Sequence, residues 1–411
     1  MIAPDRDLLL ELLRTPTAGP LETDGEVRLW DAVHAYAGAA HAFGMHTAHL
    51  GPASPEVIRR ADVPAVVREA VRRDPGFLEC QPSLVLRLGH AEPAVMFNVH
   101  LDTVAPVEPV GFDGVRFHGR GAIDAKGPAV ALLAGLREAA RDPAVGRDVS
   151  VLVQAVSGEE GGAMGVYGTR PLVEAGFHGT LNVFCEPTGL RCLPRCTAAM
   201  TAAVVVRGED AIDDEPHAGH NATVLLGFLA QHLALVLAGC VPDGWVCVAG
   251  LHTGRLHNRV YGSGELLLNL SYGSAESAAV LTGALEEGLR DGLVEFTERF
   301  RGTQPFRRTA VDASAITALE WRKRGLPALR DHDVPDLDGI APPWPAGEPG
   351  FTCDAIWLAD VPGTRTAVLG PGSLETNNAH ARGEHAHVEE LDRFSAVVCE
   401  LVTRFARNGG R

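Results

Sequence analysis

The stretch that decides the fold is VMFNVHLDTVAP, from Val95 to Pro106. Its first half is an apolar run of the kind found in strands that are buried on both faces of a sheet. The run ends at His100, and Asp102 follows two positions later, so in a strand both side chains point to the same side. Because ligands of open α/β sheets bind at the carboxyl ends of the strands, this pair marks a candidate site. A single His-x-Asp pair is more often incidental, so the rest of the chain must support it.

Similar apolar runs recur along the chain and alternate with helical segments. Strands are expected at SLVLRLG (83–89), AVMFNVHLD (94–102), VSVLVQAVS (149–157), GTLNVFCEP (179–187) and residues 365–369. A glycine-rich loop enters a helix in RGAIDAKGPAVALLAGLREAARD (120–142), and VEELDRFSAVVCELVTRFAR (388–407) reads as a closing helix. This alternation predicts an α/β fold with a largely parallel sheet and helices on both faces.

The chain has 411 residues, which favours two domains. After Arg195 the pattern changes to strands and helices that together suggest a small α+β insert. The α/β pattern returns after about residue 310. We therefore predict a catalytic domain in two parts, residues 1–196 and 311–411, interrupted by an inserted domain at 197–310.

The charge and the cysteines exclude several classes of protein. The net charge of −16 argues against a nucleic acid or an anionic membrane as partner, because both require a basic face. The amino-terminal segment MIAPDRDLLLELLRTP lacks the basic start and the long apolar core of a signal peptide. Eight scattered cysteines without a CxxC pair are typical of reduced thiols. The sequence therefore predicts a cytoplasmic protein with no membrane and no nucleic-acid partner.

Further acidic residues and a histidine follow the other expected strands. Asp124 lies in the glycine-rich loop, where aspartate is also a common helix N-cap. Glu159 and Glu160 are adjacent carboxylates that repel each other unless a positive charge holds them, the alternative being a solvated acidic turn. Glu186 follows a strand directly, and His380 lies on the loop after the last strand.

Together with His100, these side chains offer the mixed nitrogen and oxygen ligands of a two-metal hydrolytic site. One further carboxylate remains free to act as a base. Their dispersion along the chain is typical of a site that the fold assembles. The strand that carries His100 would then end at the floor of the site.

Seven motifs occur in order over nearly the whole chain: VHLDTVAP, GRGAIDAKG, SGEEGG, EPTG, GFTCDA, GPGS and AHARGE. In this they resemble the M20 metallopeptidase and deacylase family, and most closely its acetylornithine deacetylase and succinyl-diaminopimelate desuccinylase branch. The resemblance implies a catalytic domain with a small lid domain that often dimerises, and hence a homodimer formed through the lid. It also implies two Zn²⁺ ions per chain, with Co²⁺ or Mn²⁺ as alternatives.

The resemblance further implies two ligand sets that share one aspartate: His100, Asp124 and Glu186 for one metal, and Asp124, Glu160 and His380 for the other. Asp102 would lie behind His100, and Glu159 would be the general base and then the acid. The expected reaction is cleavage of an N-acyl or peptide-like amide of a small molecule by metal-activated water.

The expected lid departs from the family pattern. The family usually has a histidine shortly before a PxxGxNA segment, whereas the corresponding positions in RGEDAIDDEPHAGHNA hold none. His217 or His220 could replace it, or each could be an ordinary surface histidine. Asn258 matches the asparagine of the family's lid and is the predicted substrate-binding residue. Ser271 stands where the family has an arginine that grips a substrate carboxylate.

Two alternatives to a deacylase remain. An M20-type dipeptidase or carboxypeptidase would use the same machinery and would differ in turning over dipeptides. A catalytically silent binding protein of the same fold belongs to another class, and the presence of Glu159 with all five ligands counts against it. A nucleotide-binding α/β protein is disfavoured because neither GxGxxG nor GxxxxGK[ST] occurs.

Overall fold

The computed structural model describes residues 1–410, which form two compact units. The first unit comprises Met1–Cys196 and Leu329–Arg411, and the second comprises Thr197–Ala328. The second unit ends later than residue 310, where the sequence predicted the end of the insert. The difference arises because β13 (Thr317–Lys323) pairs antiparallel with β8 (Ala198–Arg207), the first strand of the unit.

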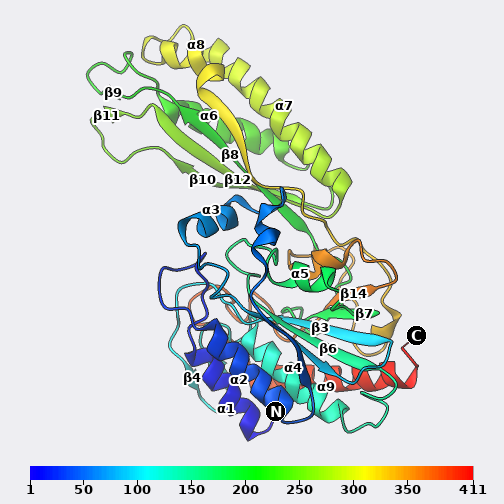
Figure 1. The fold of residues 1–411 in the computed structure, drawn as a ribbon. Coiled ribbons are helices and arrows are strands. Elements are labelled where there is room, and N and C mark those ends of the chain that lie inside the picture. The colour runs from blue at the N-terminus through cyan, green and yellow to red at the C-terminus, as the bar shows by residue number, and fades with distance from the viewer. Residues whose placement is uncertain (411) are drawn as a thin grey trace. The chain divides into compact units, whose positions relative to one another are not determined.

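A six-stranded sheet forms the centre of the first unit (Figure 1). In spatial order its strands are β1 (His46–Gly51), β2 (Ser83–Leu88), β6 (Ser150–Val156), β3 (Ala94–His100), β7 (Leu181–Phe184) and β14 (Arg365–Val368). The four strands β6, β3, β7 and β14 are parallel, while β1 and β2 form an antiparallel edge. The predicted α/β fold with a largely parallel sheet is confirmed.

Helices lie on both faces of this sheet (Figure 1). One face carries α1 (Ala3–Arg14), α2 (Leu29–His41), α4 (Lys126–Ala139) and α9 (Val388–Arg407), and the other carries α5 (Thr169–Glu174). The unit also contains α3 (Ala65–Arg73) and a small sheet of β4 (Gly111–Phe112), β5 (Arg116–His118) and β15 (His385–His387). Short 3₁₀ turns are η1 (Pro55–Arg59), η3 (Pro335–Leu337) and η4 (Asp354–Leu358).

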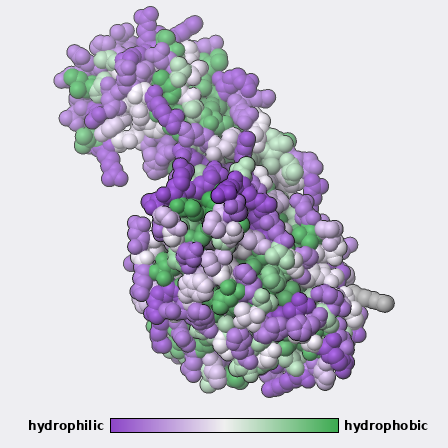
Figure 2. Space-filling model, viewed as in Figure 1, coloured by the Kyte–Doolittle hydropathy of each residue, from purple (hydrophilic) through white to green (hydrophobic). Residues whose placement is uncertain are grey.

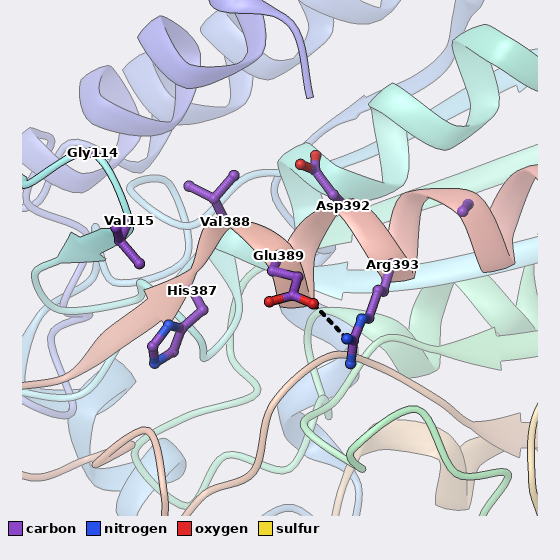
Figure 3. Close-up of a pocket in the computed structure, with 8 residues that line it drawn as sticks. Gly114, Val115, His387, Val388, Glu389, Asp392 and Arg393 are labelled. Carbon is purple, nitrogen blue, oxygen red and sulfur yellow. Dashed lines mark hydrogen bonds and ion pairs between the residues drawn. The ribbon is translucent and has the colours of Figure 1, made fainter.

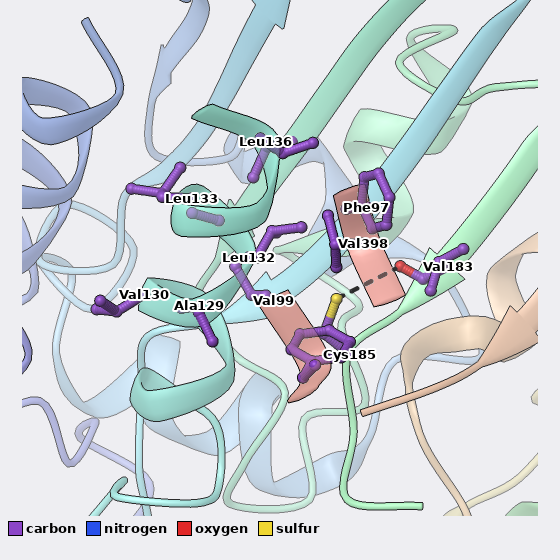
Figure 4. Close-up of a cluster of buried hydrophobic side chains, with 14 of the residues drawn as sticks. Phe97, Val99, Ala129, Val130, Leu132, Leu133, Leu136, Val183, Cys185 and Val398 are labelled. Atoms are coloured by element: carbon purple, nitrogen blue, oxygen red, sulfur yellow. Dashed lines mark hydrogen bonds between the residues drawn. The ribbon is translucent and has the colours of Figure 1, made fainter. Parts of the chain in front are cut away.

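The main apolar core lies between the sheet, α4 and α9 (Figure 4). Phe97 and Val99 of β3 belong to this core. Asn98 and His100 alternate with them along the strand and therefore point to the opposite face. There Asn98 donates a hydrogen bond of 3.1 Å to the hydroxyl of Thr169 in α5. The strand is thus buried on both sides, and His100 stands at its carboxyl end.

The second unit is an antiparallel sheet combined with helices. The sheet order is β10 (Trp245–His252), β12 (Ser263–Tyr272), β8 and β13. The helices are α6 (Ala222–Leu237), α7 (Ala275–Phe300) and α8 (Arg307–Ile316), the last preceded by the turn η2 (Gln304–Phe306). A separate ribbon pairs β9 (Ala211–Ile212) with β11 (Arg259–Val260).

Hydrophilic residues are spread over the visible surface of both units, with apolar residues in small groups among them (Figure 2). Among residues 1–410, none of the helices combines the length and the apolar character that a membrane span requires. The longest apolar run of the sequence forms α6, which buries five of its leucines in the second unit, while Leu235 is exposed.

Candidate metal centre

Three parallel strands bring predicted ligands to one edge of the central sheet. His100 is the last residue of β3, the turn with Glu159 and Glu160 follows β6, and Glu186 lies just beyond β7. Since these strands are parallel neighbours, their carboxyl ends meet at the same edge. The sheet topology alone therefore gathers four of the predicted site residues.

Two loops and one tight turn complete the cluster. Asp124 lies two positions before the start of α4, and His380 lies between β14 and β15. His380 has a φ of 61°, a left-handed conformation that residues other than glycine seldom adopt and that often marks functional sites. The turn that carries Glu159 requires Gly158, because its φ is +80° and an added Cβ would lie 2.2 Å from the ring of Tyr167.

The carboxylate of Asp124 lies between the two histidines. Its Oδ1 is 2.9 Å from Nε2 of His100, and its Oδ2 is 3.0 Å from Nε2 of His380. His380 Nε2 is also 3.0 Å from Oε1 of Glu160, and His100 Nε2 is 3.9 Å from Oε1 of Glu186. Asp124 therefore joins two half-sites, each of which has its own histidine and its own glutamate.

Three groups of side chains bring their possible ligand atoms within 4.8 Å of one another: His100 with Asp124 and Glu186, Asp124 with Glu160 and His380, and His100 with Glu159 and Glu160. The first two groups have the same members as the two ligand sets that the family resemblance implied. The third adds Glu159, which belongs to neither group that contains Asp124. That these groups hold ions stays a prediction.

Asp102 contacts both His100 and the acidic turn. Nδ1 of His100 is 2.9 Å from the backbone oxygen of Asp102 and 3.7 Å from its Oδ1. Oδ2 of Asp102 accepts a hydrogen bond of 3.1 Å from the backbone N–H of Glu160. The aspartate thus lies behind the histidine, as expected, and also holds the backbone of the neighbouring turn.

Crowding of the acidic groups shifts their pKa values. Burial raises the pKa of Glu186 to about 8, and burial together with the charge of Glu160 raises the pKa of Glu159 well above its ordinary value. Although burial opposes it, hydrogen bonds from both histidines keep the pKa of Asp124 below its ordinary value. Hydrogen bonds to Asp124 and Glu160 raise the pKa of His380 to about 10. These pKa shifts indicate that the carboxylates of the cluster carry more negative charge than its two histidines can neutralise.

The donor set fits divalent cations. Both ring nitrogens of His100 face oxygen atoms that only accept hydrogen bonds, a carbonyl at Nδ1 and a carboxylate at Nε2. In the metal-free protein both nitrogens therefore need a proton, and the pKa of His100 is raised well above its ordinary value although burial opposes it; a cation beside Nε2 would take the place of one of these protons. Oε1 of Glu160 is buried without a hydrogen bond of good geometry, although His380 lies nearby. Imidazole nitrogen and carboxylate oxygen are ligands that zinc takes in catalytic sites.

Three buried side chains near the cluster were not predicted. Asp354 accepts a hydrogen bond of 2.5 Å from Thr169, and the pKa of its carboxyl group is raised to about 7, mainly by burial. Arg120 and Glu384 form a buried ion pair of 2.7 Å beside the Asp124 loop. All three lie within motifs that the sequence displays, but a motif does not reveal the contacts of its members.

The second unit contains the predicted substrate-binding residue Asn258, which is exposed in the turn before β11. His220 is buried there. Its Nδ1 accepts a hydrogen bond of 2.9 Å from the backbone of Glu209, and its Nε2 lies 3.1 Å from Asp312. Both of its nitrogens are therefore engaged within the unit, whereas His217 is exposed and lines a surface cavity of about 280 Å³.

A larger surface cavity, of about 590 Å³, lies at the start of α9 (Figure 3). Its lining includes His387, Glu389 and Arg393, and Figure 3 shows the ion pair between the last two. None of the predicted metal ligands is among the described residues that line it. The cavity is therefore separate from the acidic cluster.

An α/β fold with acidic and histidine side chains gathered at the carboxyl edge of its sheet is typical of metal-dependent hydrolases. The chain belongs to peptidase family M20/M25/M40, whose family model matches residues 96–404. It is accordingly a hydrolase that acts on amide bonds and that has a candidate metal-binding site.

Curated relatives and solved structures agree with this membership. A succinyl-diaminopimelate desuccinylase of Gluconobacter oxydans (strain 621H) is 28% identical over 307 residues, which cover 69% of this chain and 71% of the relative. A putative [LysW]-lysine/[LysW]-ornithine hydrolase of Aeropyrum pernix is 31% identical over 183 residues, or 44% of this chain and 48% of the relative.

The M20 family metallo-carboxypeptidase Sso-CP2 from Sulfolobus solfataricus has a TM-score of 0.73 at 12% identity, covering 99% of this chain and 100% of its own. Aminopeptidase PepT from Bacillus cereus has a TM-score of 0.68 at 14% identity, covering 98% of each chain. At such low identities these two likenesses show the fold alone.

Proposed function

We propose that the protein is a two-metal amidohydrolase that removes an N-acyl group, of the kind in acetylornithine, or cleaves a peptide-like amide. The observation that carries the proposal is the position of Asp124, whose two oxygens face two separate histidines at 2.9 and 3.0 Å. A carboxylate in this position can bridge two cations, while Glu159 remains beside them as a base. The first unit would be the catalytic domain and the second unit the lid.

The expected ions are two Zn²⁺ per chain, with Co²⁺ or Mn²⁺ as alternatives. His100, Asp124 and Glu186 would hold one ion, and Asp124, Glu160 and His380 the other. When bound, the ions would polarise the amide carbonyl and lower the pKa of the attacking water. Asp102 would orient His100, since a hydrogen bond to the distal ring nitrogen fixes the tautomer of a ligating histidine.

Glu159 would move the proton. It lies within reach of His100 and Glu160 and is absent from both groups that share Asp124. In the reaction its carboxylate would accept a proton from the attacking water and then donate it to the departing amine. The charge of Glu160 favours proton uptake by Glu159, since it raises the pKa of its neighbour.

The amine and the acyl group of the substrate are open to test. Ser271, at the position of the expected arginine, is buried in β12 between Ala199 and Trp245 of the adjacent strands. A small buried hydroxyl cannot replace a guanidinium that grips a carboxylate. We therefore expect an amide whose α-carboxylate is blocked or contributes little. The two curated relatives act, by their names, on a succinylated diamino acid and on a LysW-linked amino acid. We expect poor activity on N-acetylornithine and N-succinyl-diaminopimelate, whose α-carboxylates are free.

A dipeptidase or carboxypeptidase is the second candidate, favoured by the match to a peptidase family model. The discriminating experiment loads the protein with zinc and measures turnover of N-acetyl amino acids, N-succinyl amino acids and dipeptides. Preferred turnover of an N-acyl substrate supports the deacylase, and preferred turnover of dipeptides supports the peptidase. Absence of turnover on the whole panel, with both ions bound, would favour the silent binding protein.

We also propose a homodimer formed through the second unit. β10 is the edge strand of its sheet, and its exposed apolar residues include Trp245, Val248 and Leu251. An exposed apolar edge strand is a template for pairing with another chain, and a second copy offers the same edge. Light scattering of Val248→Lys should show a monomer where the unchanged chain is a dimer. A cytoplasmic location is part of the same proposal, supported by eight cysteines that are all free thiols.

A further inference from the structure

The carboxylate of Glu384 is buried directly beneath the loop that carries Asp124. Only 1% of the residue is exposed. Its Oε1 accepts hydrogen bonds from the backbone N–H groups of Ile123, at 3.1 Å, and Asp124, at 3.3 Å. The carboxylate therefore holds the backbone of Asp124 and leaves the side chain of that residue free to face the histidines.

The other oxygen of Glu384 is held by Arg120. Nη1 of Arg120 donates a hydrogen bond of 2.7 Å to Oε2, and Nε donates one of 3.2 Å to the backbone oxygen of Pro106. Arg120 is itself only 4% exposed. A buried carboxylate needs such a partner, because an unpaired charge in the interior is strongly unfavourable.

The same glutamate connects the Asp124 loop to the loop of His380. Glu384 follows His380 by four positions, and its backbone oxygen accepts a hydrogen bond of 3.1 Å from Gly119. Main chain and side chain of one residue thus join two loops, each of which provides a ligand of the proposed second half-site.

We propose that Glu384, held by Arg120, is a positioning residue that sets the place of Asp124 relative to His380 and so determines the affinity of the site for metal. The effect on metal affinity rests on the proposed function, whereas the contact between Glu384 and the Asp124 loop exists without metal. The two levels can therefore be tested separately.

The first test uses metal-free protein in EDTA and measures hydrogen exchange at residues 119–126. Glu384→Gln should accelerate exchange of the two amides about tenfold or more, since the single oxygen of glutamine cannot serve both Arg120 and the two amides. The matched control is Glu389→Gln, which removes an exposed carboxylate that pairs with Arg393 on the same stretch of chain (Figure 3). The control should leave these amides unchanged, and unchanged exchange in Glu384→Gln would overturn the inference.

The second test titrates zinc into each variant. Loss of a residue that orients a ligand typically lowers metal affinity about 10–100-fold, and we expect that range for Glu384→Gln. With Co²⁺ as the probe, the visible absorption band should change in Glu384→Gln and stay as in the unchanged protein in Glu389→Gln. A purely structural role would lower thermal stability without changing the band.

A third variant covers the case in which Glu384→Gln does not fold. Arg120→Lys keeps the charge but loses the second hydrogen-bonding nitrogen, and it should lower zinc affinity in the same direction. Equal zinc affinity in a folded Arg120→Lys variant and in Glu389→Gln would count against the proposal. If the unchanged protein binds no zinc while Glu384→Gln still accelerates exchange, the positioning contact stands and the proposed function fails.

Discussion

Zinc binding should release about two protons per chain at pH 7. When Zn²⁺ is added to metal-free protein, it must displace protons that the proposed ligands hold, and these protons are released. Glu186 has its pKa raised to about 8, mainly by burial, and His380 has its pKa raised to about 10 by Asp124 and Glu160.

The magnitude follows from these two values. At pH 7 a carboxyl group with a pKa of about 8 is about nine-tenths protonated, and a histidine with a pKa of about 10 is almost fully protonated. Glu159 and His100 have raised pKa values as well, so their contributions have the same sign. Two protons per binding event make the apparent affinity for zinc rise by up to about 100-fold per pH unit, until Glu186 is deprotonated near pH 8.

The assay is calorimetric titration of zinc in several buffers that differ in their enthalpy of ionisation. The slope of the measured enthalpy against that quantity gives the number of protons released. Glu186→Gln should lower the number by about one, and the surface variant Glu389→Gln should leave it unchanged. Release of fewer than about one proton in the unchanged protein, or an affinity that does not increase with pH, would refute the reasoning.

Three further predictions concern the base, the metal-free protein and the lid. Glu159→Gln should keep both ions and lose roughly 10²–10⁴-fold in turnover, whereas Glu160→Gln should lose metal. Elemental analysis of each variant together with its kinetics checks this. The reverse result would show that Glu160 is the base and Glu159 the ligand. As the pH rises from 5 to 7, the free energy of unfolding of the metal-free protein should fall by up to about 1.4 kcal/mol per pH unit. The reason is that Glu186 has a pKa of about 8 in the folded protein and keeps its proton, whereas the unfolded chain releases that proton near pH 4.5. Chemical denaturation measures the slope, and Glu186→Gln should flatten it. Finally, a free-acid substrate should be preferred over its carboxamide by less than about a hundredfold, since the bidentate arginine pair is missing. A stronger preference that Arg255→Ala or Arg259→Ala abolishes would instead show that one of these arginines grips the carboxylate.

Much of the site could be predicted because its members come from strand ends. An apolar strand that ends in His100, and acids that follow other strands, identify residues whose place is set by sheet topology. The glycine at 158 and the left-handed conformation of His380 refine the geometry but do not change which residues meet. The pairing of Arg120 with Glu384 could not be predicted, because the two residues are 264 positions apart and no local pattern connects them.

The second unit shows the same limit. β13 has all seven residues half-buried and lacks a clear apolar face, so its sequence, TALEWRK with charged residues near its end, did not mark it as part of the insert. Its pairing with β8 is a tertiary contact, and the boundary predicted at residue 310 therefore fell short. His220 is a similar case, because only the fold reveals that its ring is held between the backbone of Glu209 and Asp312.

Two carboxylates hold the loops of the centre by the same means, and this explains how acidic loops can keep their shape before any cation binds. Oε1 of Glu384 accepts the backbone N–H groups under Asp124, and Oδ2 of Asp102 accepts the backbone N–H of Glu160. Each of these ligands is therefore placed through its own main chain, and its side-chain oxygens stay available for metal. Asp102 also contacts His100 at the other half-site, but through its backbone oxygen, which lies 2.9 Å from Nδ1, whereas its side-chain Oδ1 is 3.7 Å away. It follows that Asp102→Ala should weaken chiefly the half-site of Glu160, because it removes the acceptor of the Glu160 backbone N–H and leaves the backbone oxygen beside His100 in place. Two-step zinc titration with a single step weakened would support this division, and equal weakening of both steps would show that the Asp102 side chain also serves His100.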